Sequence, residues 1–153
     1  MTTHKQIGLL SLPVFVAALG YFVDVYDLLL FTIVRQPSVM SLGSTTETII
    51  VDSAHIINWQ MSGLLIGGIV WGILGDKKGR LKVLFGSIVL YSAANFLTSF
   101  VQTVDQYAYC RFIGGIGLAG ELGAGITLVS EMLPKDKRGI GTSMVAGVGL
   151  FGA

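Results

Sequence analysis

The sequence predicts an all-α protein that crosses a membrane several times. Hydrophobic residues make up 52% of the 153-residue chain and charged residues only 12%, whereas about a quarter of the residues in a soluble domain are charged. The mean hydropathy is +0.74, and long apolar segments alternate with short polar ones. Most of these segments have the ~20 residues that a helix needs to cross a hydrocarbon core. We therefore expect a polytopic membrane protein with four transmembrane helices and part of a fifth.

The first expected span covers residues 9–34. Pro13 stands near its start, where a helix tolerates proline. The apolar run is too long for the hydrophobic region of a cleaved signal peptide, so we expect it to stay in the mature protein. A loop from Arg35 through Pro37 to Asp52 follows, and because it is poor in cations it is expected on the external side.

A cationic turn at 76–82 separates the second and third expected spans, 54–75 and 83–103. One acid, Asp76, stands there against four cations: Lys77, Lys78, Arg80 and Lys82. Short loops rich in lysine and arginine remain cytoplasmic, so this turn sets the orientation of the helices. The third span contains no aspartate, glutamate, lysine, arginine or histidine, and we expect it to be a scaffold helix.

The fourth expected span, 107–133, is followed by a second cationic loop at 134–139 and by an apolar segment at 140–153. That last segment would form a helix only about 21 Å long, which is too short to span a membrane. We therefore expect an N-terminal fragment, with the remainder of the same polypeptide as its partner.

The positions of the cations support one topology. Of the ten lysines and arginines, Arg35 falls outside, Arg111 lies within a span, and the others fall inside: Lys5, Lys77, Lys78, Arg80, Lys82, Lys135, Lys137 and Arg138. This bias predicts a multi-pass protein of the cytoplasmic (inner) membrane with a cytoplasmic N-terminus. The charge pattern gives no indication of nucleic-acid binding.

Four ionisable residues lie well inside the expected spans: Asp24, Asp27, Arg111 and Glu121. Such residues are costly in lipid unless they pair or line a wet cavity. At 1.5 Å per residue, Asp27 lies about 10 Å and Arg111 about 6 Å from the external ends of their helices, within reach of each other. The sequence therefore predicts an Asp27–Arg111 pair, which either couples protons to transport or only locks two helices together.

The two remaining carboxylates are expected deeper in the membrane. Asp24 is then the more readily protonated acid or a second partner for Arg111, and Tyr21 lies in the same stripe along the cavity. Glu121 falls near the bilayer midplane, where carriers hold a substrate or coupling ion. A role in helix packing is the alternative for Glu121.

At the cytoplasmic end, Arg80, Glu131 and Arg138 are expected to form a cluster with Asp76 that ties the two inner loops together. An intact network of this kind would act as a closed inner gate. Ordinary solvated charges, worth under about 1 kcal/mol, are the alternative.

Glycines mark turns and close helix contacts. We expect Gly75 and Gly79 to permit the tight cationic turn, and Gly72, Gly115 and Gly117 to allow helices to approach closely. Residues 115–120 also match G-x-G-x-x-G, but that dinucleotide-binding pattern requires a preceding strand and here lies within one apolar segment. The single cysteine, Cys110, has no nearby partners for a metal site.

Several motifs resemble those of the major facilitator superfamily of secondary transporters. Gly72-x-x-x-Asp76-Lys77-x-Gly79-Arg80-x-Lys82 is similar to the signature between its second and third helices, and Arg111-x-x-x-Gly115-x-Gly117 to that of its fourth. Glu131-x-x-Pro134-x-x-x-Arg138-Gly139 resembles the following loop of sugar porters and related proton symporters. Asp24-x-Tyr26-Asp27 and Gly120-Glu121-x-Gly123 look more like proton symporters of organic anions and other metabolites.

The resemblance implies a carrier of two six-helix halves, of which this chain is part of the first. It also implies that Asp27 is the proton-coupling acid. We expect proton-coupled symport of a small polar solute, either an organic acid or a sugar, without cofactor or metal. The alternatives are a proton-independent facilitative sugar carrier and, from another class, a membrane enzyme or sensor, for which no H-E-x-x-H or G-x-S-x-G motif gives support.

Overall fold

The computed structural model describes residues 12–134, 136 and 138–151. These residues form five helices: α1 (Leu12–Ser41), α2 (Ile49–Lys78), α3 (Arg80–Thr98), α4 (Val104–Met132) and α5 (Arg138–Leu150). The predicted all-α class is confirmed. The expected start of the first span at residue 9 and the cations Lys5, Lys135 and Lys137 lie outside the described residues.

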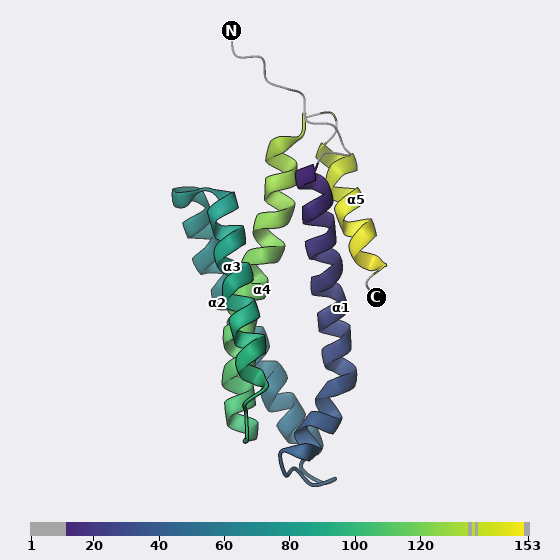
Figure 1. The fold of residues 1–153 in the computed structure, drawn as a ribbon, viewed down its shortest axis with the longest axis vertical. Helices are drawn as coiled ribbons and strands as arrows, with labels where there is room; N and C mark the ends of the chain where they lie inside the picture. The colour runs from purple at the N-terminus through teal and green to yellow at the C-terminus, as the bar shows by residue number, and fades with distance from the viewer. Residues whose placement is uncertain (1–11, 135, 137, 152–153) are drawn as a thin grey trace.

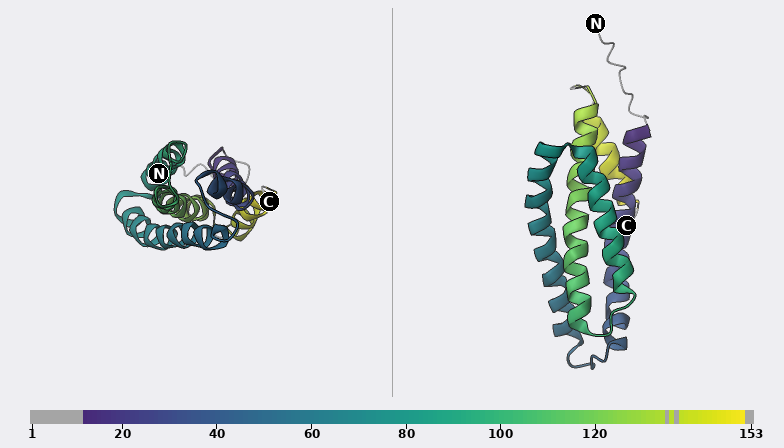
Figure 2. Two further views of the ribbon diagram at one scale, coloured as in Figure 1. Left: turned by 90° about the horizontal axis from the view of Figure 1, so that it is seen from below. Right: turned by 60° about the vertical axis from the view of Figure 1, so that its left-hand side comes forward.

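The helices run up and down along one long axis (Figure 1). The start of α1, the α2–α3 turn and the end of α4 lie at one end, and the connections 42–48 and 99–103 lie at the other (Figures 1 and 2). Helix α4 is central, because it packs against α1, α2, α3 and α5. The cationic turn and the start of α1 thus share an end, as the expected topology requires.

Three of the described helices are long and apolar enough to cross a membrane: α2, α3 and the Val104–Glu131 part of α4. They overlap the second, third and fourth expected spans, and by length and composition they are candidates to cross a membrane. The first span at 9–34 and the partial fifth at 140–153 remain predictions.

The helices extend further into the polar segments than predicted. Helix α1 continues through Pro37 to Ser41, although a loop was expected from Arg35. Beyond Pro37, Val39 is fully buried in a cluster with Phe31 and Ile56. This packing offsets the ~3 kcal/mol that an interior proline costs a helix.

The expected loop 76–82 is also wrong, because the break between α2 and α3 is confined to Gly79. Its φ of 90° lies in the left-handed region that favours glycine. The Gly79 N–H donates to the carbonyl of Gly75 at 3.0 Å and closes the last turn of α2. A positive φ at one residue is therefore sufficient to reverse the chain.

Glycines permit close contact between α4 and its neighbours. A Cβ at Gly117 would lie 2.7 Å from the backbone nitrogen of Tyr91 on α3, and one at Gly67 would lie 2.6 Å from the carbonyl oxygen of Ile116. Gly115 packs directly on the backbone of α2 at Gln60. No side chain larger than hydrogen fits at these contacts without moving a helix.

Gly72 does not have the expected packing role. A Cβ there would meet nothing within 4 Å in the described part of the chain. The physical reason is helical phase, since five residues at about 100° each turn Gly72 about 140° away from Gly67. Sequence spacing alone did not separate the glycines of the two faces.

The two kinds of glycine predict different effects of added methyl groups. Gly117→Ala should destabilise the bundle by about 1–3 kcal/mol, because α3 and α4 must separate to accept the Cβ. Gly72→Ala, the matched control, should leave stability unchanged or raise it by up to about 1 kcal/mol through helix propensity. Thermal unfolding in detergent, followed by tryptophan fluorescence, measures both. Equal melting shifts in the two variants would contradict the close α3–α4 contact.

Candidate functional site

Asp27 is held where three helices meet. Its Oδ2 accepts a hydrogen bond from the hydroxyl group of Tyr91 on α3. The same oxygen lies 3.8 Å from Nη1 of Arg111 on α4. One carboxylate on α1 thus contacts both a hydroxyl donor and a cation, each on a different neighbouring helix.

Aromatic rings enclose the guanidinium group of Arg111. Its central carbon lies 4.1 Å from the ring centroid of Phe31 and 5.4 Å from that of Tyr107. Nη2 also donates to the Tyr107 hydroxyl at 3.4 Å. The side chain is only 13% exposed, so the rings and the carboxylate of Asp27 together replace water around the charge.

The pairing of Asp27 with Arg111, which we predicted from their depths in the membrane, agrees with the contact in the structure. Sequence reasoning missed Tyr91, because the third span was interpreted as a scaffold helix. A weak signal was present, since Asn95 follows Tyr91 by one helical turn and puts two polar side chains on one face. The aromatic enclosure had a similar signal: Phe31 lies four residues after Asp27, and Tyr107 four residues before Arg111.

Asp24 has a different environment from Asp27, although both are on α1. The residue is 1% exposed, and neither carboxylate oxygen has a hydrogen-bond partner in the described part of the chain. The structure does not bring Asp24 into the Arg111 pair, so its expected role as a second partner is not realised here. Three positions separate Asp24 and Asp27 by about 4.5 Å along the helix and about 60° around it, so they share a face of α1 but meet side chains at different levels of the bundle.

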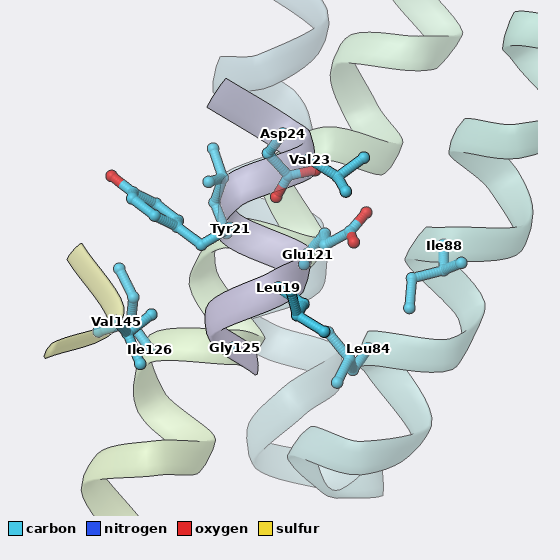
Figure 3. Close-up of a pocket in the computed structure, with 12 residues that line it drawn as sticks. Leu19, Tyr21, Val23, Asp24, Leu84, Ile88, Glu121, Gly125, Ile126 and Val145 are labelled. Atoms are coloured by element: carbon cyan, nitrogen blue, oxygen red, sulfur yellow. The ribbon is translucent and has the colours of Figure 1, made fainter. Parts of the chain in front are cut away.

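Glu121 of α4 approaches the face of α1 that carries Asp24. A Cβ at Gly20 would lie 3.4 Å from Glu121 Oε1. Gly20 and Asp24 are four residues apart and share a helix face, so the Glu121 carboxylate lies about one turn from Asp24. Figure 3 shows both acids at the same cavity.

This cavity has a volume of about 320 Å³ and lies between α1, α3, α4 and α5. Tyr21 lines it, but its ring extends toward α5 and away from the carboxylates (Figure 3). The ring packs with the apolar cluster of Ala18, Val129, Leu133 and Val145. The structure therefore places both Tyr21 and Asp24 at the cavity, with the Tyr21 ring on the side of α5.

At the α2–α3 turn, Arg80 joins two helices. Its Nη2 lies 2.7 Å from Asp76 Oδ1 on α2, and its Nε lies 3.4 Å from Glu131 Oε1 on α4. Gly75 makes room for this side chain, since a Cβ there would lie 2.7 Å from Arg80 Nη1. All three charged groups are partly exposed to solvent.

The expected participation of Arg138 in this cluster is wrong. Its Nε donates to the carbonyl of Leu133 at 3.1 Å, and it forms no ion pair with Glu131 in the described part of the chain. Arg138 starts α5 and so satisfies a carbonyl left free at the end of α4. Its role is to shape the α4–α5 connection.

Nothing in the described residues brings three histidine, cysteine, aspartate or glutamate side chains together as a metal site would require. In the described residues the site consists of the Asp27–Arg111 ion pair at one level and of two neighbouring acids, Asp24 and Glu121, at another. Long apolar helices that enclose ionisable groups and a cavity are typical of integral membrane proteins that move solutes.

The sequence comparisons agree with this class. The family model of the Major Facilitator Superfamily matches residues 8–153, and the chain belongs to that family. Members of this family are multi-pass membrane transporters.

Several relatives have known or provisional names. The chain is 34% identical over 140 residues to a Haemophilus influenzae protein provisionally named a metabolite transport protein, covering 90% of this chain and 33% of that one. It is 33% identical over 125 residues to the provisionally named niacin/nicotinamide transporter NiaP of Bacillus subtilis, covering 81% and 30%. It is also 35% identical over 77 residues to human synaptic vesicle glycoprotein 2A, covering 50% and 10%.

The chain thus spans about a third of the length of the bacterial relatives that it matches. No solved structure matches the chain.

The Asp27–Arg111 contact predicts non-additive losses of stability. Asp27→Asn or Arg111→Gln alone leaves a partner uncompensated at membrane depth and should cost as much as about 3 kcal/mol, whereas the double variant should cost less than the sum. Thermal unfolding of the four proteins in detergent gives the coupling energy. Glu47→Gln, at an exposed loop residue, is the control for the loss of one charge. Losses that simply add would show that the two side chains do not interact.

Proposed function

We propose that this chain forms part of a carrier that moves a small polar solute across the cytoplasmic membrane by alternating access, in symport with protons. The observation that carries the proposal is the bridging of three helices by the carboxylate of Asp27. A proton on this carboxylate would remove its charge and weaken its attraction to Arg111. Protonation would therefore loosen α1 from α4, which is the kind of linkage that couples a proton to helix movement.

The proton would also change what Arg111 can bind. Its Nε has no hydrogen-bond partner in the described part of the chain. Once Asp27 is neutral, the guanidinium could donate hydrogen bonds to an anionic or hydroxyl-bearing group of the solute. Binding of a proton would then favour binding of the solute, and the reverse, as symport requires.

The resemblance of the motifs favours an organic acid or a sugar as the solute. The names of the relatives, a metabolite transport protein and a niacin/nicotinamide transporter, also support a small metabolite. A proton-independent facilitator is the second candidate. The aromatic enclosure of Arg111 favours it, because rings packed on the guanidinium group and on each other suit a permanent latch between helices.

Proton coupling through Asp27 predicts a selective loss of uphill transport. Asp27→Asn should abolish uphill uptake driven by a proton gradient but retain downhill exchange, because the neutral side chain can no longer change charge. Proteoliposomes that contain the polypeptide as its gene encodes it, and a panel of labelled metabolites including nicotinate and nicotinamide, would measure both. Glu47→Gln is the matched control. Full gradient-driven uptake in both Asp27→Asn and Asp24→Asn would remove the coupling role and favour the facilitator.

We propose further that Arg80, Asp76 and Glu131 form a gate at the cytoplasmic end. Arg80 joins the α2–α3 turn to α4 and so holds these helices together in the described conformation. Separation of the helices during the transport cycle would break the contact with Glu131, because that acid lies on α4. The contact with Asp76 would persist, because Asp76 stands only four residues before Arg80, across the turn at Gly79.

This gate predicts a shift in conformational balance. Arg80→Ala should increase labelling of a cysteine introduced at Thr127, which lies beside Arg80 in a cavity of about 220 Å³ on the same side of α4. Lys82→Ala should not, because Lys82 makes no ion pair in the described part of the chain. Labelling with a membrane-impermeant maleimide in inside-out vesicles measures access, with Cys110 replaced by serine. Equal labelling in the Arg80→Ala and unchanged backgrounds would contradict the gate.

A further inference from the structure

The cavity beside Asp24 combines apolar walls with two acids. Its volume is about 320 Å³, at the lower end of the range for small-molecule sites. The apolar wall includes Leu19 and Val23 of α1, Leu84 and Ile88 of α3, and Ile126 of α4 (Figure 3). The polar side chains that face this space belong to Asp24, Glu121 and, at its edge, Tyr21.

Among the residues that the structure describes, Asp24 lacks the basic or hydroxyl partner that a buried acid normally has, and its nearest ionisable neighbour in the cavity is another acid, Glu121. Asp24 is only 1% exposed, and neither of its carboxylate oxygens has a hydrogen-bond partner in the described residues. In the part of the chain that the structure describes, no lysine, arginine or histidine lines the cavity. Arg111 is occupied by Asp27 and by two aromatic rings at another level of the bundle. A buried carboxylate without a donor is completed either by a proton or by a cation, and the apolar walls around Asp24 and Glu121 decide which kind of cation would fit.

The chemistry of the walls discriminates between kinds of cation. A metal ion such as calcium takes six to eight oxygen ligands, whereas two carboxylates supply at most four oxygens and the carbonyls of regular helices are already hydrogen-bonded. An anionic solute would be repelled by both acids. A small organic cation satisfies both features, because its charged nitrogen faces the carboxylates and its hydrocarbon part covers the apolar wall.

We propose that this cavity binds the protonated nitrogen of a small organic cation between Asp24 and Glu121. Binding of a cation in this cavity does not depend on the proposed transport function. Only the further step, that the bound cation is the transported solute, rests on that function. The proposed cation site lies at a different level of the bundle from the Asp27–Arg111 contact and narrows the solutes to those that carry a basic nitrogen. Gly20 marks where the Glu121 carboxylate approaches α1, since a Cβ at Gly20 would lie 3.4 Å from Glu121 Oε1.

Three probes of similar size and different charge test the proposal: benzylammonium, benzyl alcohol and benzoate. Isothermal titration calorimetry would be carried out on the polypeptide as its gene encodes it, in lipid nanodiscs, with empty nanodiscs as the blank for partitioning. Benzylammonium should bind about tenfold or more tightly than benzyl alcohol, since charge-assisted hydrogen bonds are about twice as strong as neutral ones. Benzoate should not displace benzylammonium, because both acids of this cavity disfavour an anion.

Isosteric variants locate the site. Asp24→Asn and Glu121→Gln should each weaken benzylammonium binding by about tenfold or more and reduce its preference over benzyl alcohol, because each removes one negative charge and keeps the side-chain shape. Glu47→Gln, which removes an acid from the exposed connection between α1 and α2, should leave affinity unchanged. If Asp24→Asn does not fold, as the loss of its melting transition would show, the Glu121→Gln variant alone is compared with the unchanged protein.

Two results would overturn the proposal. One is equal affinity for the three probes, or unchanged benzylammonium affinity in Glu121→Gln; the two acids would then hold a proton only. The other is saturable benzoate binding that competes with benzylammonium. The calorimetry measures binding without a proton gradient and so is independent of transport. Benzylammonium that binds as expected but is not transported would support the cation site and contradict the proposed transport of such a solute.

Discussion

The constraint on which the rest of this structure depends is the cost of placing charge at membrane depth. A lone arginine in the hydrocarbon core is unfavourable by several kcal/mol. Arg111 avoids this cost through the carboxylate of Asp27 and the rings of Phe31 and Tyr107. These partners come from two helices, so satisfying one guanidinium group holds α1 against α4. Tyr91 extends the constraint to α3, since its hydroxyl donates to the same carboxylate.

Two aspartates separated by three residues have opposite environments in this bundle. Asp27 has a cation and a hydroxyl donor, whereas Asp24 has neither. A protein that needed both acids only for stability would gain nothing from leaving one of them buried and unpartnered, because an unsatisfied buried acid lowers stability. The contrast supports a division of roles, with Asp27 linking helices and Asp24 left available for a ligand.

The sequence could predict what depends on composition and depth. Helical class, the cationic turn and the approach of Asp27 to Arg111 follow from apolar length, loop charge and 1.5 Å per residue. Rotation about the helix axis was harder to predict. Gly72 shows this, because it lies on a different face of α2 from Gly67 and packs against no helix in the described residues. Continuation of α1 past Pro37 depended on burial of Val39 by distant residues. Arg138 could not be placed from spacing, because its bond is to a backbone carbonyl that every residue possesses.

The two levels of the bundle favour different charges on a solute. Protonation of Asp27 would release Arg111, whose free donor suits a carboxylate or hydroxyl group. The cavity around Asp24 and Glu121 contains acids without a cation and suits a basic nitrogen. The resemblance to organic-anion symporters and the acidic cavity are therefore compatible if the solute carries both kinds of group. Such a solute would contact α1 and α4 at both levels. Its binding would then depend on the relative position of these two helices, which in the proposed mechanism a proton on Asp27 would change.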